Sequence, residues 1–392
     1  MKIGLLGFGV VGSGAYSLLE KHFKDSCLVQ VLVRDVEKYK QNYPEIEFTN
    51  QAELILDNSE IDLIIETIGG LEPAYTYVKK ALSAGKHVIT SNKALVYEYH
   101  QELSKLAAKN QVQFRFEASV GGGIPIINAL ENIYWDRDIQ KISGILNGTS
   151  NYILSAMFYE KLSYQQALNQ AQKLGYAEEN PIDDVEGMDT FRKIGILSQA
   201  YYGGKIRTCP GRRGIKELSL ADIEFAKLKG YHIKLIASIE KVQSEKFEIL
   251  LVPRWVPEHE SLAHIEYAEN RVDLKSKEWG TLSFIGQGAG HLATGLSVVS
   301  DLQKIAEGKT YPWEIKDKTL EQVTMKHDYC VRPRGDKNIK KSDIESISRQ
   351  YRKEVFKGQS YYLLEQADIL DLIEIFGEQA AILKIESEME GQ

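Results

Sequence analysis

The stretch that most constrains this chain is GLLGFGVVGSG, residues 4–14, close to its first residue. An apolar run leads into Gly7, Gly9 and Gly12, which have G-x-G-x-x-G spacing. In a strand–turn–helix unit these glycines permit the tight turn, the approach of a pyrophosphate to the backbone, and close packing of helix on strand. A purely structural turn is the alternative. A strand before the glycines and a helical pattern after them favour a dinucleotide site.

Strand-like and helical segments alternate from residue 2 to residue 123. Residues 2–9, 28–34, 61–70, 85–93 and 112–123 have the apolar runs of buried strands. Residues 11–24, 52–57, 73–84 and 99–109 between them have helical patterns. This alternation predicts an α/β fold whose N-terminal part is a Rossmann-type, doubly wound parallel sheet.

The pattern changes after residue 123. Residues 139–148, 246–256 and 268–276 look like strands of a second, mixed sheet, and residues 150–161, 164–174, 184–202, 220–237 and 293–307 look helical. We predict a dinucleotide-binding domain over residues 1–118, completed by about residues 286–310. An α+β substrate domain over 119–285 and a small α+β appendage over 315–392 follow.

The composition limits the partners. A net charge of −7 gives no reason to expect nucleic-acid binding, which requires a clustered positive surface. The three cysteines lie far apart, which argues against a disulfide framework and a cysteine zinc site. The first residues enter a strand directly, and no apolar run approaches the roughly 18 residues of a membrane span. We therefore expect a cytoplasmic protein that binds no membrane.

Two charged residues end the second predicted strand, Arg34 and then Asp35. An acidic residue at this place hydrogen-bonds the ribose 2′-hydroxyl of NAD, whereas an arginine favours the 2′-phosphate of NADP. Because Arg34 comes first, we favour NADP, with NAD also open. Two solvated charges on a turn are the alternative.

Two more segments end strands of the same sheet, ETIGG at residues 66–70 and TSNK at residues 90–93. Ligands of an open parallel sheet bind beyond the carboxyl ends of its strands. We therefore expect both segments to face the cofactor, and Lys93 to belong to the site rather than to be an ordinary surface lysine.

Charge is concentrated in LGYAEENPIDDVEGMDTFRKIGIL, residues 174–197. Asp189 and Lys193 stand at i and i+4 of a predicted helix, so they share a face. One hypothesis is a solvated helix whose ion pair contributes only ~0.3–0.5 kcal/mol. The apolar Ile194 and Leu197 favour partial burial of Lys193 instead. A desolvated lysine can exchange protons near neutral pH, which suits hydride transfer from an alcohol.

Two glycine-rich segments allow close backbone approach. The segment EASVGGGIPII, residues 117–127, exposes carbonyl oxygens that suit a monovalent cation or simply joins two domains, and the residues alone favour the join. The segment GQGAG, residues 286–290, is compatible with a contact to the nicotinamide side of a cofactor.

Taken together, these segments resemble the homoserine dehydrogenase family. The resemblance rests on GFGVVGSG, ETIGG, GKHVITSNKAL, EASVGGGIPII, ISGILNGTSNYIL, LGYAEENPIDDVEGMDTFRKI, LKGYHIKLIAS and GQGAG, in the family's order over roughly residues 1–301. It implies reversible reduction of L-aspartate 4-semialdehyde to L-homoserine with NADPH or NADH, a step of threonine and methionine biosynthesis. It also implies a homodimer, or a tetramer, assembled through the middle sheet.

The resemblance implies a set of site residues. The catalytic residues would be Lys193, as proton donor and acceptor, and Lys93. The amino-acid substrate would contact Glu178, Asp184, Asp189, Asn147, Gly148, Thr149 and Tyr176. The cofactor would contact Gly7, Phe8, Gly9, Val10, Val11, Gly12, Arg34, Thr67, Ile68, Gly69, Ser91, Asn92, Lys93, Gly175 and Gly288. A monovalent cation such as Na+ would be held mainly by backbone oxygens of Glu117, Val120, Gly122 and Ile124.

The chain departs from the family pattern in three places. Asn180 stands where an acidic residue is usual, and Ala293 stands where proline is common. The C-terminal residues occupy the place of a regulatory ACT domain, yet HDYCVRP, residues 327–333, lacks the usual D-x-P-G-V-L turn. We therefore expect an altered, ACT-like appendage without ordinary threonine feedback inhibition.

Two other functions compete with this one. Another amino-acid-linked dehydrogenase is the first, but the phosphorylating semialdehyde type needs a nucleophilic cysteine, and Cys27, Cys209 and Cys330 lie outside the motifs. A redox-sensing protein without catalysis is the second. Such a protein is expected to lose its substrate residues, whereas Lys93 and Lys193 are both present with the carboxylates of the charged segment.

Overall fold

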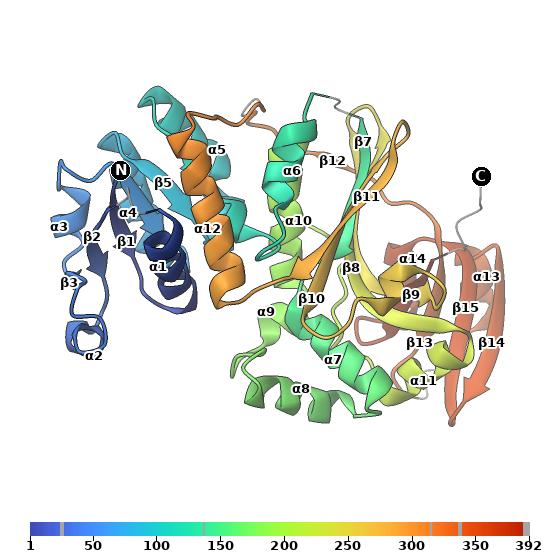
Figure 1. Ribbon diagram of the computed structural model, residues 1–392. Coiled ribbons are helices and arrows are strands. Elements are labelled where there is room, and N and C mark those ends of the chain that lie inside the picture. The colour runs from blue at the N-terminus through green and yellow to red at the C-terminus, as the bar shows by residue number, and fades with distance from the viewer. Residues whose placement is uncertain (24–26, 136–137, 314–315, 336–338, 387–392) are drawn as a thin grey trace. The chain divides into compact units, whose positions relative to one another are not determined.

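The chain forms two compact units, which the labels and colours of Figure 1 allow the reader to trace. A computed structural model describes residues 1–23, 27–135, 138–313, 316–335 and 339–386. Unit 1 comprises residues 1–137, 195–205 and 284–319, and unit 2 comprises residues 138–194, 206–283 and 320–392. The division into three domains by function stays a prediction.

Unit 1 is built on a parallel sheet. Its described strands lie in the order β3-β2-β1-β4-β5-β6, which reverses direction between β1 and β4. This order is that of a Rossmann-type sheet, so the predicted doubly wound fold is confirmed. The strands are β1 (Lys2–Leu6), β2 (Cys27–Leu32), β3 (Phe48–Thr49), β4 (Leu63–Glu66), β5 (His87–Thr90) and β6 (Phe114–Arg115).

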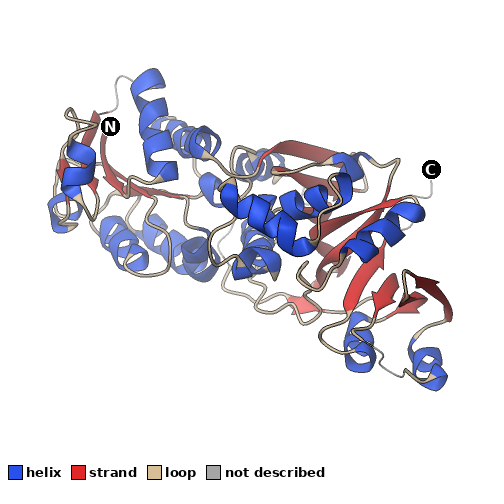
Figure 2. Ribbon diagram, turned by 90° about the horizontal axis from the view of Figure 1, so that it is seen from below, coloured by secondary structure: helices blue, strands red, loops and turns tan. Residues whose placement is uncertain are grey.

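Helices cover both faces of this sheet, as Figure 2 shows. One of them, α12, comes from far along the chain and packs on α1. A Cβ on Gly14 would lie 1.9 Å from the carbonyl oxygen of His291, so only glycine allows this approach. The helical elements are α1 (Val10–His22), α2 (Val36–Lys40), α3 (Glu53–Leu56), α4 (Ala74–Ser83), α5 (Lys93–Lys109), η1 (Glu117–Ser119), α6 (Ile126–Ile133) and α12 (His291–Ala306).

Unit 2 contains one long mixed sheet in the order β11-β10-β7-β8-β9-β16-β13-β15-β14, with β12 paired to β9. Its strands are β7 (Ile139–Ile145), β8 (Tyr231–Gln243), β9 (Lys246–Pro257), β10 (Glu269–Ser276), β11 (Gly280–Gln287), β12 (Glu321–Gln322), β13 (His327–Arg332), β14 (Gln350–Phe356), β15 (Gln359–Ala367) and β16 (Ala381–Ile385). Its helical elements are α7 (Gly148–Tyr159), α8 (Tyr164–Lys173), α9 (Ile182–Val185), α11 (Leu220–Leu228), η2 (Ser261–His264), α13 (Lys341–Ile347) and α14 (Ile369–Phe376). The helix α10 (Met188–Tyr201) and the strand β11 both begin in unit 2 and end in unit 1.

The C-terminal elements follow the order β13-α13-β14-β15-α14-β16, with the strands arranged β16-β13-β15-β14. This is the β-α-β-β-α-β arrangement of ferredoxin-like folds. The strand β16 pairs in parallel with β9, Lys384 opposite Arg254, so the C-terminal strands continue the middle sheet. The small α+β appendage is present in this form, and its relation to ACT domains stays a prediction.

Several predicted element boundaries are wrong. Residues 231–237, expected in a helix, belong to the strand β8, because α11 ends before Gly230, whose φ is +82°. The helix predicted from residue 99 begins at Lys93, since Asn92 caps its N-terminus. The helix predicted over 184–202 is split by Gly187, whose φ is +78°. The fifth strand is short because residues 117–119 form a 3-10 turn, and β11 was not predicted.

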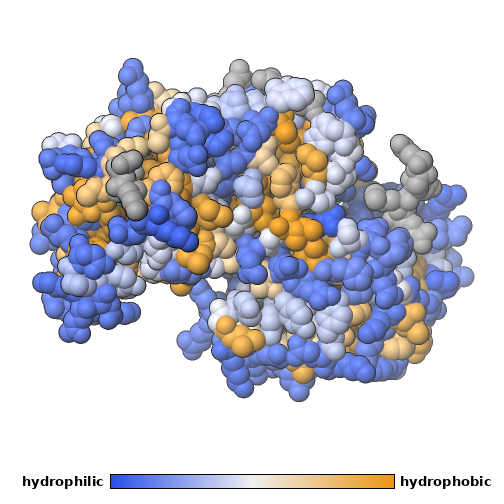
Figure 3. Space-filling view, in the orientation of Figure 1, coloured by the Kyte–Doolittle hydropathy of each residue, from blue (hydrophilic) through white to orange (hydrophobic). Residues whose placement is uncertain are grey.

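Figure 3 shows one face of the surface, where hydrophilic residues predominate and apolar residues form separate patches. Within the described residues, no helix combines the length and the apolar composition that crossing a bilayer requires.

Candidate active site

A cavity of about 460 Å³ lies in unit 1 where the strand order reverses. The C-terminal ends of β1, β2 and β4 meet here, which is where dinucleotides bind in sheets of this kind. The cavity therefore lies where the glycine spacing predicted a cofactor. Its lining is Gly7, Phe8, Gly9, Leu32, Val33, Arg34, Asp35, Lys38, Tyr39, Asn50, Thr67, Ile68, Pro73 and Tyr77.

The three glycines of the G-x-G-x-x-G motif have separate roles in this turn. Gly7 has a φ of +98°, and its carbonyl accepts a hydrogen bond from Thr67 Oγ1 at 3.0 Å. A Cβ on Gly12 would lie 2.3 Å from the Gly7 carbonyl oxygen, so α1 can pack here only without a side chain. A Cβ on Gly9 would meet nothing within 4 Å, which leaves this backbone open to a ligand. Gly9 precedes α1 without a side-chain cap, so the first N–H groups of the helix are available to a phosphate.

The neighbouring residues of the motif are placed differently. Phe8 is buried in a cluster of aromatic rings, with ring centroids 5.6 Å from Tyr39 and 5.0 Å from Tyr43. Val10 is exposed and Val11 is half-buried in the first turn of α1. The Phe8 side chain therefore holds the loop in place, while the backbone of the loop faces the cavity.

Three charged residues line the part of the cavity that follows β2. Asp35 is the N-cap of α2, and its Oδ1 accepts the backbone N–H of Lys38 at 3.2 Å. Arg34 is exposed, and Arg34 and Lys38 line the same cavity. Lys38 was not predicted from the sequence, although its place four residues after Arg34, in the first turn of a helix, could have indicated it.

The segments ETIGG and TSNK lie side by side at the ends of β4 and β5. Glu66 is fully buried, and its carboxylate accepts hydrogen bonds from Ile68 N at 2.7 Å and from Thr90 Oγ1 at 2.5 Å. Burial raises the pKa of the Glu66 carboxyl, and these donors oppose that shift. Asn92 Nδ2 donates to the Gly70 carbonyl at 2.6 Å. Glu66 is thus a residue that organises both loops, and sequence reasoning gave it no role.

Lys93 is the first residue of α5, the helix that TSNK opens. The Asn92 side chain accepts the Leu95 N–H at 3.1 Å, and Lys93 itself is half-buried. Ser91 N donates to the Glu66 carbonyl at 3.2 Å, and Gly69 N donates to the Glu66 carboxylate at 3.2 Å. The bonds of Ser91 and Leu95 fix the backbone on both sides of Lys93, and the bond of Gly69 fixes the neighbouring loop.

In unit 2, four of the predicted site residues form one hydrogen-bonded cluster. Lys193 Nζ lies 2.8 Å from Asp189 Oδ2 and donates to the Leu146 carbonyl at 2.7 Å. Asn147 Nδ2 donates to Asp189 Oδ2 at 2.8 Å and to Asp184 Oδ1 at 2.7 Å. The Lys193 side chain is only 10% exposed, and that of Asp189 is 2% exposed. The alternative of a solvated helix with an exposed ion pair is therefore wrong.

The cluster has the composition of a proton-transfer site. The ammonium of Lys193 is held by one carboxylate and one carbonyl, and Asn147 supports that carboxylate from the other side. Asn147 also caps α7, since its Oδ1 accepts the Ser150 N–H at 2.7 Å. A lysine fixed in this way presents its proton from a defined position.

The remaining predicted substrate residues lie in the same unit. Thr149 Oγ1 donates to the Tyr176 carbonyl at 2.6 Å, and Gly148 is the first residue of α7. Gly175 has a φ of +79° where α8 ends. Glu178 is exposed, and among the described residues its carboxylate has no hydrogen bond or ion pair, so the structure does not bring it into the Lys193 cluster.

The predicted cation turn is a tightly bonded segment of unit 1. Both oxygens of the buried Glu117 carboxylate accept backbone N–H groups, from Ile127 at 2.9 Å and from Asn128 at 2.7 Å, so this side chain caps α6. The carbonyl of Gly122 accepts from Ser297 Oγ at 2.5 Å, and that of Ile124 accepts from Ile126 N at 2.8 Å. The carbonyl of Glu117 accepts from Val120 N at 3.4 Å. In the part of the chain that the structure describes, no three histidine, cysteine or acidic side chains gather as a metal site would require.

The second glycine cluster packs on this turn. A Cβ on Gly122 would lie 2.5 Å from the carbonyl carbon of Gly288, and Gly123 N donates to Gln287 O at 3.1 Å. The observed role of Gly288 is therefore close backbone packing within unit 1, and its contact with the cofactor stays a prediction.

Glu117 and Asp301 are two buried acids that a network of hydrogen bonds and an ion pair connects to Arg115. The sequence did not indicate this network. Asp301 Oδ2 accepts the Glu117 N–H at 2.8 Å, and Asp301 Oδ1 lies 3.6 Å from Arg115 Nη1. Burial and the charge of Asp301 raise the pKa of Glu117 to about 8. Burial, partly offset by Arg115, raises the pKa of Asp301 to about 7. Both acids thus hold protons in the folded chain that the unfolded chain releases.

These shifts predict that the protein loses stability as the pH rises. The folded-state pKa values lie above the unfolded ones, so the stabilisation is complete at low pH and disappears between about pH 4 and pH 8. We expect the free energy of unfolding to fall by on the order of 3 kcal/mol from pH 6 to pH 8, since each such group contributes about 1.4 kcal/mol per pH unit until it titrates. Urea unfolding at a series of pH values measures this, and Asp301→Asn should give a shallower dependence. A free energy that stays constant or rises over this interval would contradict the prediction.

Comparisons with known proteins show the family of the chain. The family model described as "Homoserine dehydrogenase, NAD binding domain" matches residues 7–117, and the model "Homoserine dehydrogenase" matches residues 125–303. The chain is 38% identical to the homoserine dehydrogenase of Bacillus subtilis over 313 residues, which cover 77% of this chain and 72% of that protein. The chain belongs to the homoserine dehydrogenase family. The resemblance carried by the sequence motifs is thereby confirmed, and with it the assignment of the chain to an oxidoreductase family.

Solved structures of homoserine dehydrogenases extend the likeness to nearly the whole chain. A homoserine dehydrogenase from Thiobacillus denitrificans matches with a TM-score of 0.86 and 30% identity, over 99% of this chain and 98% of that one. The homoserine dehydrogenase of S. aureus at pH 7.5 matches with a TM-score of 0.78 and 33% identity, over 99% of both chains. The residues that line the cavity of unit 1 fall within the match to the NAD binding domain, and those of the lysine cluster fall within the match to residues 125–303.

Proposed function

We propose that this chain catalyses the reversible NADPH-dependent reduction of L-aspartate 4-semialdehyde to L-homoserine. The observation that carries the proposal is the Lys193–Asp189–Asn147 cluster, in which a nearly buried ammonium is held at 2.8 Å from a carboxylate. The cavity above the glycine motif fits a dinucleotide, because Gly9 leaves the backbone open at the N-terminus of α1.

The chain's own residues manage the proton of the reaction. A bound nicotinamide cofactor supplies the hydride to the aldehyde carbon, or accepts it from the alcohol in the reverse direction. The Lys193 ammonium donates a proton to the substrate oxygen as negative charge develops there, and takes the proton back in the reverse direction. Leu146 O and Asp189 orient the ammonium between these events.

Charged side chains suit the two ends of the amino-acid substrate. The substrate ammonium is a partner for the carboxylates of Glu178 and Asp189, with Asp184 supporting Asp189 through Asn147. Lys93 is a partner for the substrate carboxylate or a second member of the proton relay. Glu178 is exposed, so it can reach a bound ligand without breaking another contact within the described residues.

Oxidation of L-homoserine tests this function directly. We expect purified protein to reduce NADP+ in the presence of L-homoserine, followed as absorbance of the reduced nicotinamide. Other alcohols that lack the amino-acid group serve as controls. No turnover of L-homoserine with either NADP+ or NAD+ would reject the proposal.

We also propose that NADP is preferred over NAD. Asp35 is engaged as the cap of α2, whereas Arg34 and Lys38 provide two positive charges on the same cavity. A 2′-phosphate would therefore meet two cations.

The preference predicts different effects of one substitution on the two cofactors. Arg34→Ala should raise KM for NADPH about 10- to 100-fold, the loss expected for a charge-assisted hydrogen bond of ~1.5–3 kcal/mol. The KM for NADH should change little, and Lys38→Ala should show the same selectivity more weakly. Steady-state kinetics with both cofactors measures this. Equal increases for NADPH and NADH would contradict the contact with the phosphate.

Three further features belong to this proposal. We infer a Na+-type cation at the backbone oxygens of the turn formed by residues 117–124, a homodimer or tetramer, and action in the cytoplasm as part of threonine and methionine biosynthesis. Resemblance to the family supports them, and titration of activity with sodium and sedimentation of the protein test the first two.

A further inference from the structure

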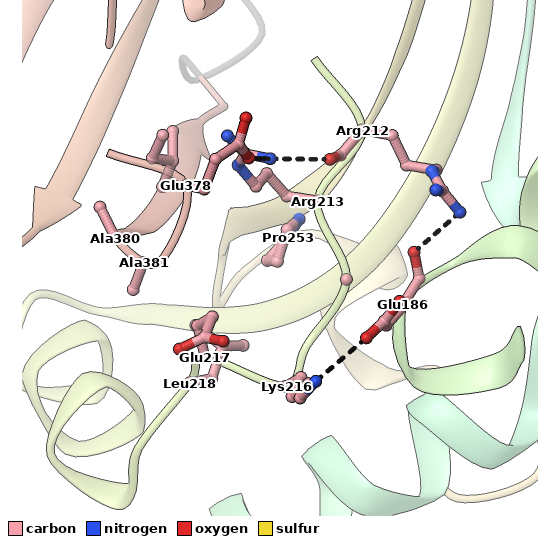
Figure 4. A pocket seen from close by; sticks show the side chains of 12 residues that line it. Glu186, Arg212, Arg213, Lys216, Glu217, Leu218, Pro253, Glu378, Ala380 and Ala381 are labelled. Carbon is pink, nitrogen blue, oxygen red and sulfur yellow. Dashed lines mark hydrogen bonds and ion pairs between the residues drawn. The ribbon is translucent and has the colours of Figure 1, made fainter. Parts of the chain in front are cut away.

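A second charged cavity lies in unit 2, against the loop formed by residues 209–218 (Figure 4). Its volume is about 250 Å³, which suits one small molecule. The loop is not part of any motif that indicated the function. The cavity is lined by Glu186, Arg212, Arg213, Gly214, Lys216, Glu217, Leu218, Pro253, Glu378, Ala380, Ala381 and Ile382.

Arg213 is the residue of this cavity whose hydrogen bonds are incomplete. Its Nη1 lies 2.9 Å from the Glu378 carboxylate and donates to the Arg212 carbonyl at 3.2 Å. Its Nε and Nη2 are buried, and among the described residues neither has a hydrogen-bond partner. A buried donor left in this way costs about 1–3 kcal/mol. The Nε–Nη2 edge of a guanidinium matches the two oxygens of a carboxylate.

The other lining residues define what can accompany that carboxylate. Lys216 Nζ lies 3.1 Å from Glu186 Oε1, and Arg212 Nη1 donates to the Glu186 carbonyl at 3.3 Å, as the dashed lines in Figure 4 show. The cations are balanced by the carboxylates of Glu186, Glu217 and Glu378, so a multiply charged anion would meet repulsion. Leu218, Pro253, Ala380, Ala381 and Ile382 provide an apolar wall. A singly charged ligand with a short apolar part fits both features.

The same loop is packed tightly beside the lysine cluster. Ile215 N donates to the Val185 carbonyl at 2.8 Å, and a Cβ on Gly214 would lie 2.0 Å from that oxygen. Val185 and Glu186 connect Asp184 to α10, the helix that carries Asp189 and Lys193. A shift of the loop is therefore transmitted to the segment that places these carboxylates.

The loop also contacts the C-terminal elements. A Cβ on Gly211 would lie 2.7 Å from Ile369 Cγ2 in α14, and Arg213 pairs with Glu378 just after that helix. Glu378 is 76% exposed, so this ion pair can open without uncovering a buried carboxylate.

We propose that this cavity binds a small carboxylate with a short apolar part, held mainly by Arg213, and that its occupancy alters the affinity of the lysine cluster for substrate. The binding half is independent of the reaction proposed above. The coupling half rests on that proposed function.

Binding is tested without turnover, using sodium butyrate as the probe. We expect butyrate to raise the melting temperature of the wild-type protein along a saturable curve, because a ligand that binds the folded state stabilises it. Sodium chloride at equal ionic strength and the uncharged butyramide should not do so. Arg213→Met should abolish the shift, while Arg352→Met, which removes an exposed arginine of β14, should keep it. A shift with butyramide, a larger shift with inorganic phosphate, or an undiminished shift in Arg213→Met would overturn the proposal.

A second variant keeps the proposal testable should Arg213→Met fail to fold. Glu378→Gln removes the carboxylate that competes for Arg213, so we expect the butyrate concentration at half-saturation to fall roughly fivefold. Binding no tighter than in the wild type would contradict the role of Arg213.

The coupling between the cavity and the lysine cluster is tested by kinetics. Butyrate should change KM for L-homoserine in the wild type and not in Arg213→Met, with KM for the cofactor unchanged. Saturable binding without a change in KM would reject the coupling alone, and absence of all turnover would reject the proposed function while leaving the binding result standing.

Discussion

Lys193→Met is expected to abolish turnover while leaving the affinity for NADPH nearly intact. The ammonium of Lys193 is held by Asp189 at 2.8 Å and by Leu146 O at 2.7 Å, and it is the group to which the proposed mechanism assigns the proton. Loss of a positioned general acid lowers kcat by about 10²- to 10⁴-fold. Steady-state kinetics gives kcat, and quenching of protein fluorescence by NADPH gives the affinity.

The substitution leaves Asp189 with one fewer partner, so its effect on folding has to be separated from its effect on chemistry. Asn147 still donates to Asp189 Oδ2, which limits the loss of stability. Thermal unfolding of the variant checks this. The matched control is Lys173→Met, which removes an exposed lysine from the end of α8 and should keep full activity. A Lys193→Met protein that folds and retains the wild-type kcat would remove Lys193 from the mechanism.

Arg115→Met is expected to destabilise unit 1 by about 3–5 kcal/mol, the range found when one partner of a buried ion pair is removed. Arg115 is fully buried, and its guanidinium lies 3.3 Å from Glu131 Oε2 and 3.6 Å from Asp301 Oδ1. Its Nη2 donates to the Lys309 carbonyl at 2.6 Å, and its Cζ lies 4.4 Å from the centre of the Tyr311 ring. Methionine fills a similar volume and supplies none of these bonds, so Asp301 loses the guanidinium beside it and, among the described residues, Glu131 keeps only Lys304, at 3.8 Å.

Chemical unfolding of wild-type and variant protein measures this loss. Arg34→Met is the control within the same unit, because Arg34 is exposed and its replacement should leave the free energy of unfolding almost unchanged. The Arg115→Met variant should also be less destabilised at low pH, where Glu117 and Asp301 are protonated. A loss of stability that is small and independent of pH would show that the network contributes little.

Local sequence signals predicted the nucleotide-binding half of the fold well. Its strands are short apolar runs separated by turns, and each helix between them has room to return to the same sheet. The strand β8 was missed because it is buried on both faces, so its side chains show no alternation that distinguishes it from a buried helix. Asn92 is a good N-cap residue and indicates that α5 begins at Lys93, although the helix was predicted to begin at residue 99.

The site was predictable to the extent that its residues lie in recognisable motifs. The spacing of Asp189 and Lys193 indicated a shared helix face, whereas the bond from Asn147 to both Asp184 and Asp189 joins segments far apart in the chain. Such contacts depend on the packing of whole elements. For the same reason nothing in the sequence singled out Asp301 as the partner of Glu117, or Arg213 as a donor left buried.

The pairing of β16 with β9 has a consequence for anyone who shortens this chain. The strand β9 is covered along its outer edge by β12 at one end and by β16 at the other. A protein ending before residue 320 would present a long, apolar strand with unsatisfied amide groups, which is a template for aggregation. Truncation would then yield insoluble material, and an inactive preparation of that kind would say nothing about regulation.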